Sequence, residues 1–276
     1  MTSATIRSVN WHVTMNCNYK CRFCFYKNMS GEFKDFEKAR QKLETLKAKG
    51  IEKINFAGGE PLLYKNLDPL LKMAKDMGFT VSIVTNAALL NESNLREMSE
   101  YVDWVGISVD SAEEEIEKQL GRGNGWHVGH AREICGLVRK YGMRLKINTT
   151  VTKMNYFEDM KPFISSLCPE RWKVFQIIHM KGQNDDALDL TLTREEFGVF
   201  RSINSGLVLK NGATPTFESV EDMLESYFII GPDGDILLSK GNQRSSIPFE
   251  SLEHMELTDL VDADKYLERG GCYDWN

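Results

Sequence analysis

Short segments in which apolar residues alternate with polar or small ones are separated by stretches with apolar residues at every third or fourth position. The first pattern is typical of strands and the second of amphipathic helices. The segments expected to be strands are 6–14, 51–56, 79–85, 104–109, 144–151 and 171–178. The segments expected to be helices are 33–49, 67–77, 90–101, 113–119, 128–141 and 156–167. These alternations predict an α/β fold with a parallel sheet and right-handed crossovers.

The regular alternation ends near residue 178. The elements expected beyond it are an irregular loop at 179–190, a helix opened by a capping box of Thr193 and Glu196, a hairpin at 227–238 and short helices near Glu250 and Leu257. The tail at 269–275 combines glycines with aromatic residues, so we expect it to fold back onto the sheet. The chain is therefore divided into a βα part, 1–180, and a C-terminal extension, 181–276.

The composition of the chain limits the classes of function that it can have. The chain has 276 residues, of which 42% are hydrophobic and 27% charged, as in ordinary globular proteins. A net charge of −6 argues against a general surface for nucleic acids or anionic membranes. No apolar run approaches membrane-spanning length. Six cysteines in a chain of this length do not form a disulfide framework and suit a reducing cytosol, so we expect a cytoplasmic protein.

Three of the cysteines share one predicted loop: Cys17, Cys21 and Cys24. Three thiolates suit a metal or an iron–sulfur cluster, and in a cluster of four irons they leave one iron open to a small ligand. Two alternatives remain at this point. One is a zinc site with a further ligand such as His12. The other is a dithiol redox pair formed by Cys21 and Cys24.

Polar residues cluster where the predicted strands end. Gly58, Gly59 and Glu60 follow the second strand, and Thr85 and Asn86 follow the third. The glycines indicate either a tight turn or a close approach of the backbone to a ligand. Because the carboxyl ends of parallel strands meet at one edge, these segments and the cysteine loop are expected to lie together, where βα barrels hold their active sites.

Three strands carry polar residues two positions apart, hence on one face: Lys53 and Asn55, Lys146 and Asn148, Arg171 and Lys173. If these faces point inward, buried cations require a counter-ion, and a polyphosphate supplies one. The alternative is that each long side chain reaches solvent from the strand start. The repetition on three strands favours the anion site.

The motifs resemble those of a known family. The CxxxCxxC spacing and Gly-Gly-Glu-Pro at 58–61 match the general motifs of radical S-adenosylmethionine (SAM) enzymes. Lys-Ile-Asn at 146–148, Arg-Trp-Lys-Val-Phe-Gln at 171–176 and Arg-Gly-Gly at 269–271 are more specific, and together they resemble the viperin family over about residues 9–275. The resemblance implies a partial (βα)6 radical-SAM barrel that the C-terminal extension closes.

The resemblance also implies roles for individual residues. Cys17, Cys21 and Cys24 are expected to bind a 4Fe–4S cluster whose open iron holds SAM. The candidates for contacts with SAM are Gly58, Gly59, Glu60, Thr85, Asn86, Ser108 and Arg122. The candidates for contacts with a triphosphate are Lys53, Lys146, Asn148, Arg171, Lys173 and Arg269, with Asn10 and Arg244 as further candidates. Tyr227 is a candidate hydrogen or electron donor, and its alternative is an ordinary buried tyrosine.

The implied activity is dehydration of a ribonucleoside triphosphate to its 3′-deoxy-3′,4′-didehydro analogue, an antiviral chain terminator, with CTP favoured over UTP and GTP. Expected partners are this substrate and an electron donor such as flavodoxin or a reductase, without nucleic acid or membrane, and the chain is expected to be a monomer. Animal members carry a membrane anchor ahead of the barrel, whereas this chain begins almost at the first strand. The alternatives are a radical SAM enzyme acting on a peptide or another small molecule, and a non-catalytic zinc module.

Overall fold

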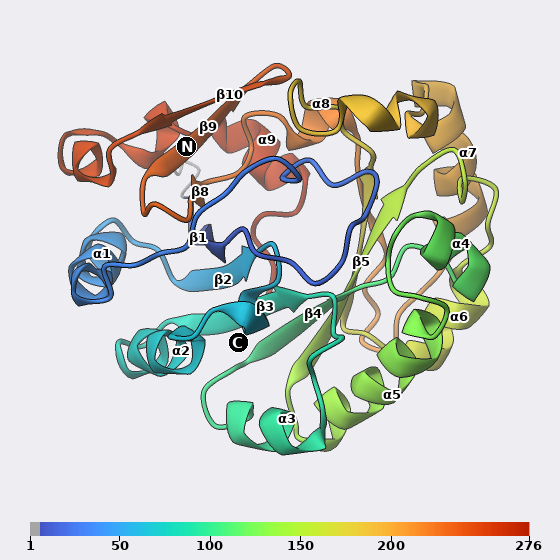
Figure 1. Cartoon of the computed structure of the whole chain (residues 1–276), viewed down its shortest axis with the longest axis horizontal. Coiled ribbons are helices and arrows are strands. Elements are labelled where there is room, and N and C mark those ends of the chain that lie inside the picture. The colour runs from blue at the N-terminus through green and yellow to red at the C-terminus, as the bar shows by residue number, and fades with distance from the viewer. Residues whose placement is uncertain (1–5, 276) are drawn as a thin grey trace.

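One ten-stranded sheet organises the molecule (Figure 1). The structure is a computed structural model that describes residues 6–275, so the outermost residues of the two expected parts lie outside it. The sheet order is β10-β9-β8-β1-β2-β3-β4-β5-β6-β7. The strands are β1 (Ser8–Thr14), β2 (Lys53–Gly58), β3 (Thr80–Thr85), β4 (Trp104–Ser108), β5 (Arg144–Val151), β6 (Arg171–Gln176), β7 (Thr216–Glu218), β8 (Ile229–Ile230), β9 (Ile236–Lys240) and β10 (Gln243–Ile247). Neighbours from β8 through β7 are parallel, and the hairpin strands β9 and β10 are antiparallel.

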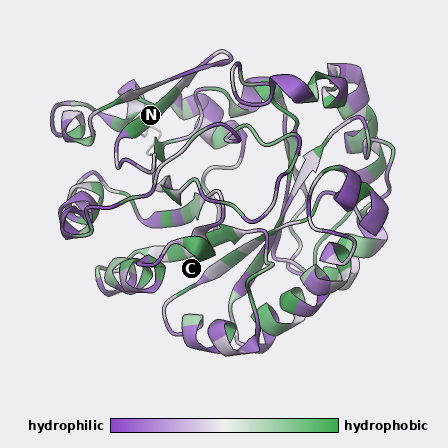
Figure 2. Ribbon diagram, in the orientation of Figure 1, coloured by the Kyte–Doolittle hydropathy of each residue, from purple (hydrophilic) through white to green (hydrophobic). Residues whose placement is uncertain are grey.

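Helices cover the outside of the curved sheet, while the loop after β1 crosses its mouth (Figure 1). The α-helices are α1 (Glu37–Ala48), α2 (Leu67–Asp76), α3 (Glu92–Met98), α4 (Glu114–Gln119), α5 (His127–Lys140), α6 (Lys161–Leu167), α7 (Arg194–Asn204), α8 (Val220–Met223) and α9 (Ala263–Glu268). Short 3-10 helices lie at Pro61–Leu63, Asp185–Leu190, Phe249–His254 and Leu257–Asp259. The helices mix hydrophilic and hydrophobic residues, as expected for elements with one face on a sheet (Figure 2).

The two faces of β1 separate core from site. Trp11 is fully buried and packs against Phe33 and Phe56, with ring centroids 5.1 and 6.0 Å away. On the opposite face, the Asn55 side chain of β2 donates a 2.9 Å hydrogen bond to Asn10 of β1. Aromatic packing therefore fixes the outer side of the strand and leaves a polar face toward the interior of the sheet.

Two helices begin later than predicted. α1 begins at Glu37 and not near residue 33, because the Phe33 N–H donates to the Val13 carbonyl at 2.8 Å and its ring packs on Trp11. α6 begins at Lys161 and not near residue 156, because Asn155 forms a turn in which its side chain accepts the Thr152 N–H at 2.7 Å. In both cases apolar residues at helical spacing belong to a packed loop before the helix.

The C-terminal extension contributes strands to both edges of the sheet. The expectation that regular alternation ends near residue 178 is wrong, since β7 pairs in parallel with β6. Residues 185–190 of the expected irregular loop form a 3-10 helix. The predicted hairpin is confirmed as β8 and β9, and β10 extends it beyond the prediction. One sheet thus spans both expected parts of the chain, and their boundary near residue 180 stays a prediction.

The sheet does not close on itself, and side chains of the C-terminal extension span the opening. Within residues 6–275, β7 and β10 are the two edges of the sheet and do not pair with each other. Tyr227, just before β8, instead donates a hydrogen bond to Glu218 of β7. The tail folds back as predicted: Trp275 is buried and its carbonyl accepts the Trp104 indole N–H at 3.1 Å. The interior is therefore bounded by the sheet, by Tyr227 and by the tail.

Candidate active site

Backbone contacts clamp the cysteine loop on two sides. Gly59 donates its N–H to the Thr14 carbonyl and Glu60 donates to Asn16, both at 2.7 Å. A Cβ on Gly59 would lie 2.4 Å from the Asn16 carbonyl oxygen, so this approach requires glycine. From the other side, the Arg22 N–H donates to the Leu120 carbonyl at 2.8 Å. The glycine pair thus brings the backbone close to the cysteine loop itself.

Gly59→Ala is expected to impair assembly of any cluster on this loop. The added methyl group must displace the loop backbone, and overpacking of this kind costs about 1–3 kcal/mol. Iron and sulfide bound after anaerobic reconstitution are the measurement. Gly136→Ala is the matched control, because Gly136 lies within α5 and its Cβ would meet nothing within 4 Å. Equal iron content in the two variants would contradict the clamp.

Cys21 and Cys24 are half-buried and Cys17 is exposed, so the three-thiol loop has an apolar side and an open side, which fits an iron–sulfur cluster with an accessible iron. Burial raises the pKa of Cys21 to about 12 and also raises the pKa of Cys17. Such thiols become ligands when a metal stabilises the thiolate. Phe23 and Leu120 lie in the hydrophobic cluster beside the loop. Within residues 6–275, no three His, Cys, Asp or Glu side chains are grouped to hold a single metal ion.

Glu60 connects three of the residues predicted to contact SAM. Its buried carboxylate accepts the Thr85 hydroxyl at 2.7 Å and the Asn86 N–H at 2.8 Å. The Asn86 side chain then donates to Asn18 at 2.8 Å and approaches the Cys17 sulfur at 3.9 Å. The structure therefore brings these predicted residues together at the carboxyl ends of β2 and β3, beside the cysteine loop.

Arg122 is held by carboxylates that sequence reasoning missed. Its Nε lies 2.6 Å from the Asp110 carboxylate and 3.6 Å from that of Glu117, and all three are buried. The guanidinium also lies 5.5 Å from the centroid of the Phe23 ring. These contacts give Arg122 a place in supporting the cysteine loop, and its predicted contact with the SAM carboxylate stays a prediction.

His127 is a further residue that the sequence did not single out. Its Nε2 donates to the carbonyl of Ser108 at 2.9 Å, and Tyr19 of the cysteine loop lies 3.4 Å from Nδ1. Burial, together with the charge of Arg122, lowers the pKa of His127 to about 3, so the ring is neutral near pH 7. His127 thus ties the end of β4, where Ser108 lies, to the cysteine loop.

The predicted cations converge in the interior. Lys53, Lys146, Arg171, Lys173 and Arg269 are 3–8% exposed, so the alternative that the strand residues reach solvent is wrong. Burial lowers the pKa of every lysine in this set, that of Lys146 to about 7, and neighbouring cations lower it further. Mutual lowering of this kind identifies a site with excess positive charge.

Arg171 has a buried donor without a partner. One terminal nitrogen donates to the Gly270 carbonyl at 2.6 Å, and the guanidinium lies 3.7 Å from the centroid of the Tyr273 ring. Among residues 6–275, its Nε, like the side-chain oxygen of Asn148, finds no hydrogen-bond partner. Buried polar groups in native proteins are nearly always paired, so the Arg171 Nε is the kind of buried donor that a bound anion satisfies.

The other predicted substrate residues divide into two places. Asn10 belongs to the interior, where Asn55 bridges it to Ser82 of β3. Arg244 does not join the interior cations in any described contact; it lies over Tyr26 of the cysteine loop, 3.7 Å from the ring centroid. The hairpin of β9 and β10 thus places Arg244 near the predicted cluster.

Tyr227 lies in the same interior and has a partner that the sequence did not reveal. Its hydroxyl accepts from Lys173 at 3.0 Å and donates to Glu218, which also forms an ion pair with Lys173. The Arg269 guanidinium covers its ring at 3.6 Å from the centroid and donates to the Ser226 carbonyl. Tyr227, for which an ordinary buried tyrosine was the alternative prediction, therefore has polar partners at its hydroxyl and a cation over its ring.

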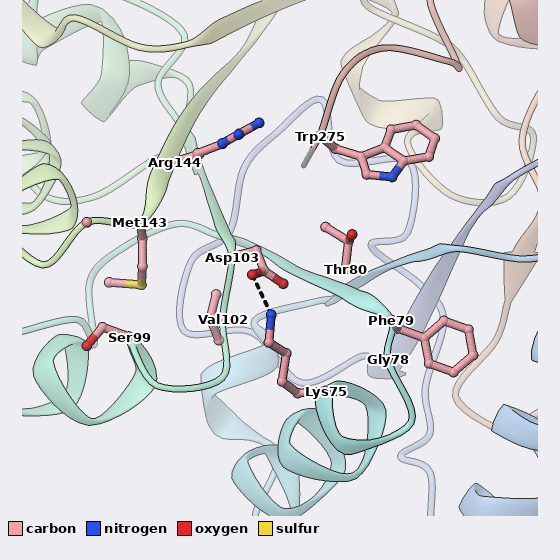
Figure 3. A pocket seen from close by; sticks show the side chains of 11 residues that line it. Lys75, Gly78, Phe79, Thr80, Ser99, Val102, Asp103, Met143, Arg144 and Trp275 are labelled. Atoms are coloured by element: carbon pink, nitrogen blue, oxygen red, sulfur yellow. Dashed lines mark hydrogen bonds and ion pairs between the residues drawn. The ribbon is translucent and has the colours of Figure 1, made fainter.

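A separate cavity of about 440 Å³ lies at the amino ends of β3 to β5 (Figure 3). Its lining includes the ion pair of Lys75 and Asp103, separated by 2.6 Å, and Trp275 of the tail. Lys53 lies inside the sheet, 5.7 Å from the centroid of the Trp275 ring. The tail therefore stands between the interior cations and this outer cavity.

Comparison with known proteins identifies the family. Residues 11–167, more than half of the chain, match the Radical SAM superfamily. The chain is a member of that superfamily. Its members use a 4Fe–4S cluster and SAM, which agrees with the three-thiol loop and decides against the non-catalytic zinc module. None of the helices in the described part is both long and apolar enough to cross a membrane.

Relatives of this radical SAM enzyme resemble it over nearly its whole length. The S-adenosylmethionine-dependent nucleotide dehydratase of Thermoplasmatales archaeon (strain ISO4-H5) is 36% identical over 98% of this chain and 96% of its own. The S-adenosylmethionine-dependent nucleotide dehydratase RSAD2 of Oncorhynchus mykiss is 32% identical over 99% of this chain and 82% of its own. The chain belongs to this family, and the predicted resemblance is confirmed.

Solved structures confirm the fold of this family member. Streptococcus suis SuiB matches with a TM-score of 0.70 at 18% identity over 97% of this chain and 68% of its own. Native anSMEcpe with bound AdoMet and Cp18Cys peptide matches with a TM-score of 0.65 at 19% identity over 95% of this chain and 81% of its own. At such identities the likeness concerns the fold alone.

Proposed function

We propose that this radical SAM enzyme removes water from a ribonucleoside triphosphate and forms the 3′-deoxy-3′,4′-didehydro analogue. CTP is the favoured substrate, with UTP and GTP as alternatives. The observation that carries the proposal is the group of five buried cations from β2, β5, β6 and the C-terminal region, with unpaired donor capacity at Arg171. The names of the full-length relatives support a nucleotide as the substrate.

The cofactors have a place that fits their chemistry. Cys17, Cys21 and Cys24 would hold the cluster, while the segment of Gly58, Gly59 and Glu60, with Thr85, Asn86, Ser108 and Arg122, would surround SAM. When bound, this pair of cofactors supplies a 5′-deoxyadenosyl radical. The protein contributes binding, orientation and exclusion of water.

The interior residues position the substrate. Lys53, Lys146, Arg171, Lys173 and Arg269, with Asn10 and Asn148, would bind the triphosphate at the far side of the interior from the cysteine loop. Fixing the phosphates in this way holds the ribose between the cations and the radical source, so that remote binding energy orients the reacting carbon. Tyr273 and Trp275 of the tail would cover the phosphates, since both already contact Lys53.

The net reaction balances as a loss of water. Removal of the 4′ hydrogen leaves a substrate radical. One electron and one proton then convert the 3′ hydroxyl into water and close the C3′–C4′ double bond. Tyr227 is the proposed local donor, and a one-electron protein such as flavodoxin or a reductase is the proposed external source. A monomer in the cytoplasm remains our expectation.

The test is incubation of the reduced, reconstituted protein with SAM and each of the four ribonucleoside triphosphates. Mass spectrometry should find a product lighter than one nucleotide by one water, with 5′-deoxyadenosine formation stimulated by that nucleotide. Equal 5′-deoxyadenosine with and without every nucleotide, and no lighter product, would overturn the proposal. A product formed only from a peptide would favour the alternative activity.

A further inference from the structure

A buried carboxylate touches the two interior groups best placed to exchange a proton. Glu218 ends β7, is fully buried and accepts the hydroxyl proton of Tyr227 on one oxygen. Its other oxygen forms an ion pair with Lys173, and Lys173 also donates to the Tyr227 oxygen at 3.0 Å. Each of the three groups therefore contacts the other two.

Glu218 is unusual for its surroundings. The neighbouring interior residues are cations proposed to bind phosphates, and a carboxylate there repels a phosphate. Lys173 requires only a counter-ion, which the substrate itself would supply. The substrate cannot replace the contact between Glu218 and Tyr227. The Tyr227 hydroxyl has a single proton, and it donates that proton in a hydrogen bond to Glu218.

A phenol gives up an electron readily only when its proton passes to a base within hydrogen-bond reach. The Tyr227 hydroxyl has such a base in Glu218, which is fully buried, while Tyr227 itself is half-buried. Burial and the Glu218 charge both raise the pKa of Tyr227, so the hydroxyl holds its proton until the electron leaves.

We propose that Glu218 is the proton acceptor of Tyr227 and takes the phenolic proton when Tyr227 supplies an electron to the substrate radical. This rests on the proposed function. The electron from Tyr227 closes the C3′–C4′ double bond as the C3′–O bond breaks. The proton passes through Glu218 to the departing hydroxide, which leaves as water. Tyr227 remains as a neutral phenoxyl radical and is restored by one electron and one proton through the external one-electron donor protein.

The test compares Glu218→Gln, Tyr227→Phe and the double variant. Glutamine keeps the size of Glu218 but does not take the proton, so product formed per 5′-deoxyadenosine should fall by roughly 100-fold, the scale of general acid–base catalysis. Binding of the nucleoside triphosphate to cluster-free protein, measured by calorimetry, should be at least as tight as in wild type, because a negative charge has been removed. In the Tyr227→Phe background, Glu218→Gln should have no further effect on the product ratio.

Glu158→Gln is the control, a partly buried acid whose carboxylate accepts the Ala112 N–H away from the interior cations. It should leave the product ratio unchanged. Weaker nucleotide binding in Glu218→Gln with an unchanged product ratio would make Glu218 a mere counter-ion for Lys173 and overturn the proposal. So would additive losses in the double variant. Failure of the proposed function itself is distinguishable, because wild type would then form no dehydrated nucleotide.

Discussion

Replacing Arg171 with alanine is expected to weaken binding of a nucleoside triphosphate to the cluster-free protein by about 100-fold, or about 3 kcal/mol. Only 7% of the Arg171 surface is exposed, and its planar guanidinium is fixed between Tyr273 and Gly270. Its unpaired Nε is the donor left for a phosphate oxygen. Charge-assisted bonds of this geometry are the strong ones. Isothermal titration calorimetry measures the loss.

Two further variants make the result specific. Arg171→Lys retains the charge but loses the planar fork, so its affinity should fall between wild type and alanine. Lys65→Ala removes an exposed cation and should leave affinity unchanged. If Arg171→Ala bound the nucleotide as tightly as Lys65→Ala, the interior would not be the triphosphate site.

The residues that the sequence revealed are those with a local signature. β5 begins and ends where alternation predicts it, at Arg144 and Val151. Because side chains two positions apart share a strand face, the repetition of such polar pairs on three strands, with Lys146 and Asn148 as one of them, was what predicted interior cations. The cysteine and glycine motifs could likewise be placed together, since both follow parallel strands that end at one edge.

The residues that the sequence missed depend on contacts between distant segments. Glu218 lies in a strand of three residues, too short for an alternation to emerge, and its significance comes from Lys173 and Tyr227. Arg122 resembled a free loop arginine until folding placed Asp110 and Glu117 beside it. Buried charges pair through contacts between segments that are distant in the sequence, so the local spacing of residues does not predict the pairs.

The start of α1 illustrates the same limit for the fold. Phe33 and Phe36 fit the helical spacing of residues 33–49, yet Phe33 packs on Trp11 and its backbone pairs with Val13. A single aromatic contact with β1 thus outweighs the local preference for another helical turn. The burial of Trp11 in turn fixes which face of β1 points inward.

Nucleotide binding is expected to take up protons at alkaline pH through the interior lysines, Lys146 among them. Burial and Arg171 lower the pKa of Lys146 to about 7 in the folded, substrate-free protein, against about 10.4 in an unfolded chain. Between these values the unfolded chain holds a proton that the folded protein lacks. The free energy of unfolding of the substrate-free protein should therefore rise with pH from about 7 to about 10.

A bound triphosphate reverses this balance, because its negative charge favours the protonated lysine. At pH 8.5, binding should take up about one proton through Lys146, and affinity should fall as pH rises across the window. Titration calorimetry in two buffers of different ionisation enthalpy measures the uptake. Lys146→Met should reduce it without removing it, since burial also lowers the pKa of Lys53 and Lys173. A binding enthalpy independent of the buffer would show that the phosphates do not reach these lysines.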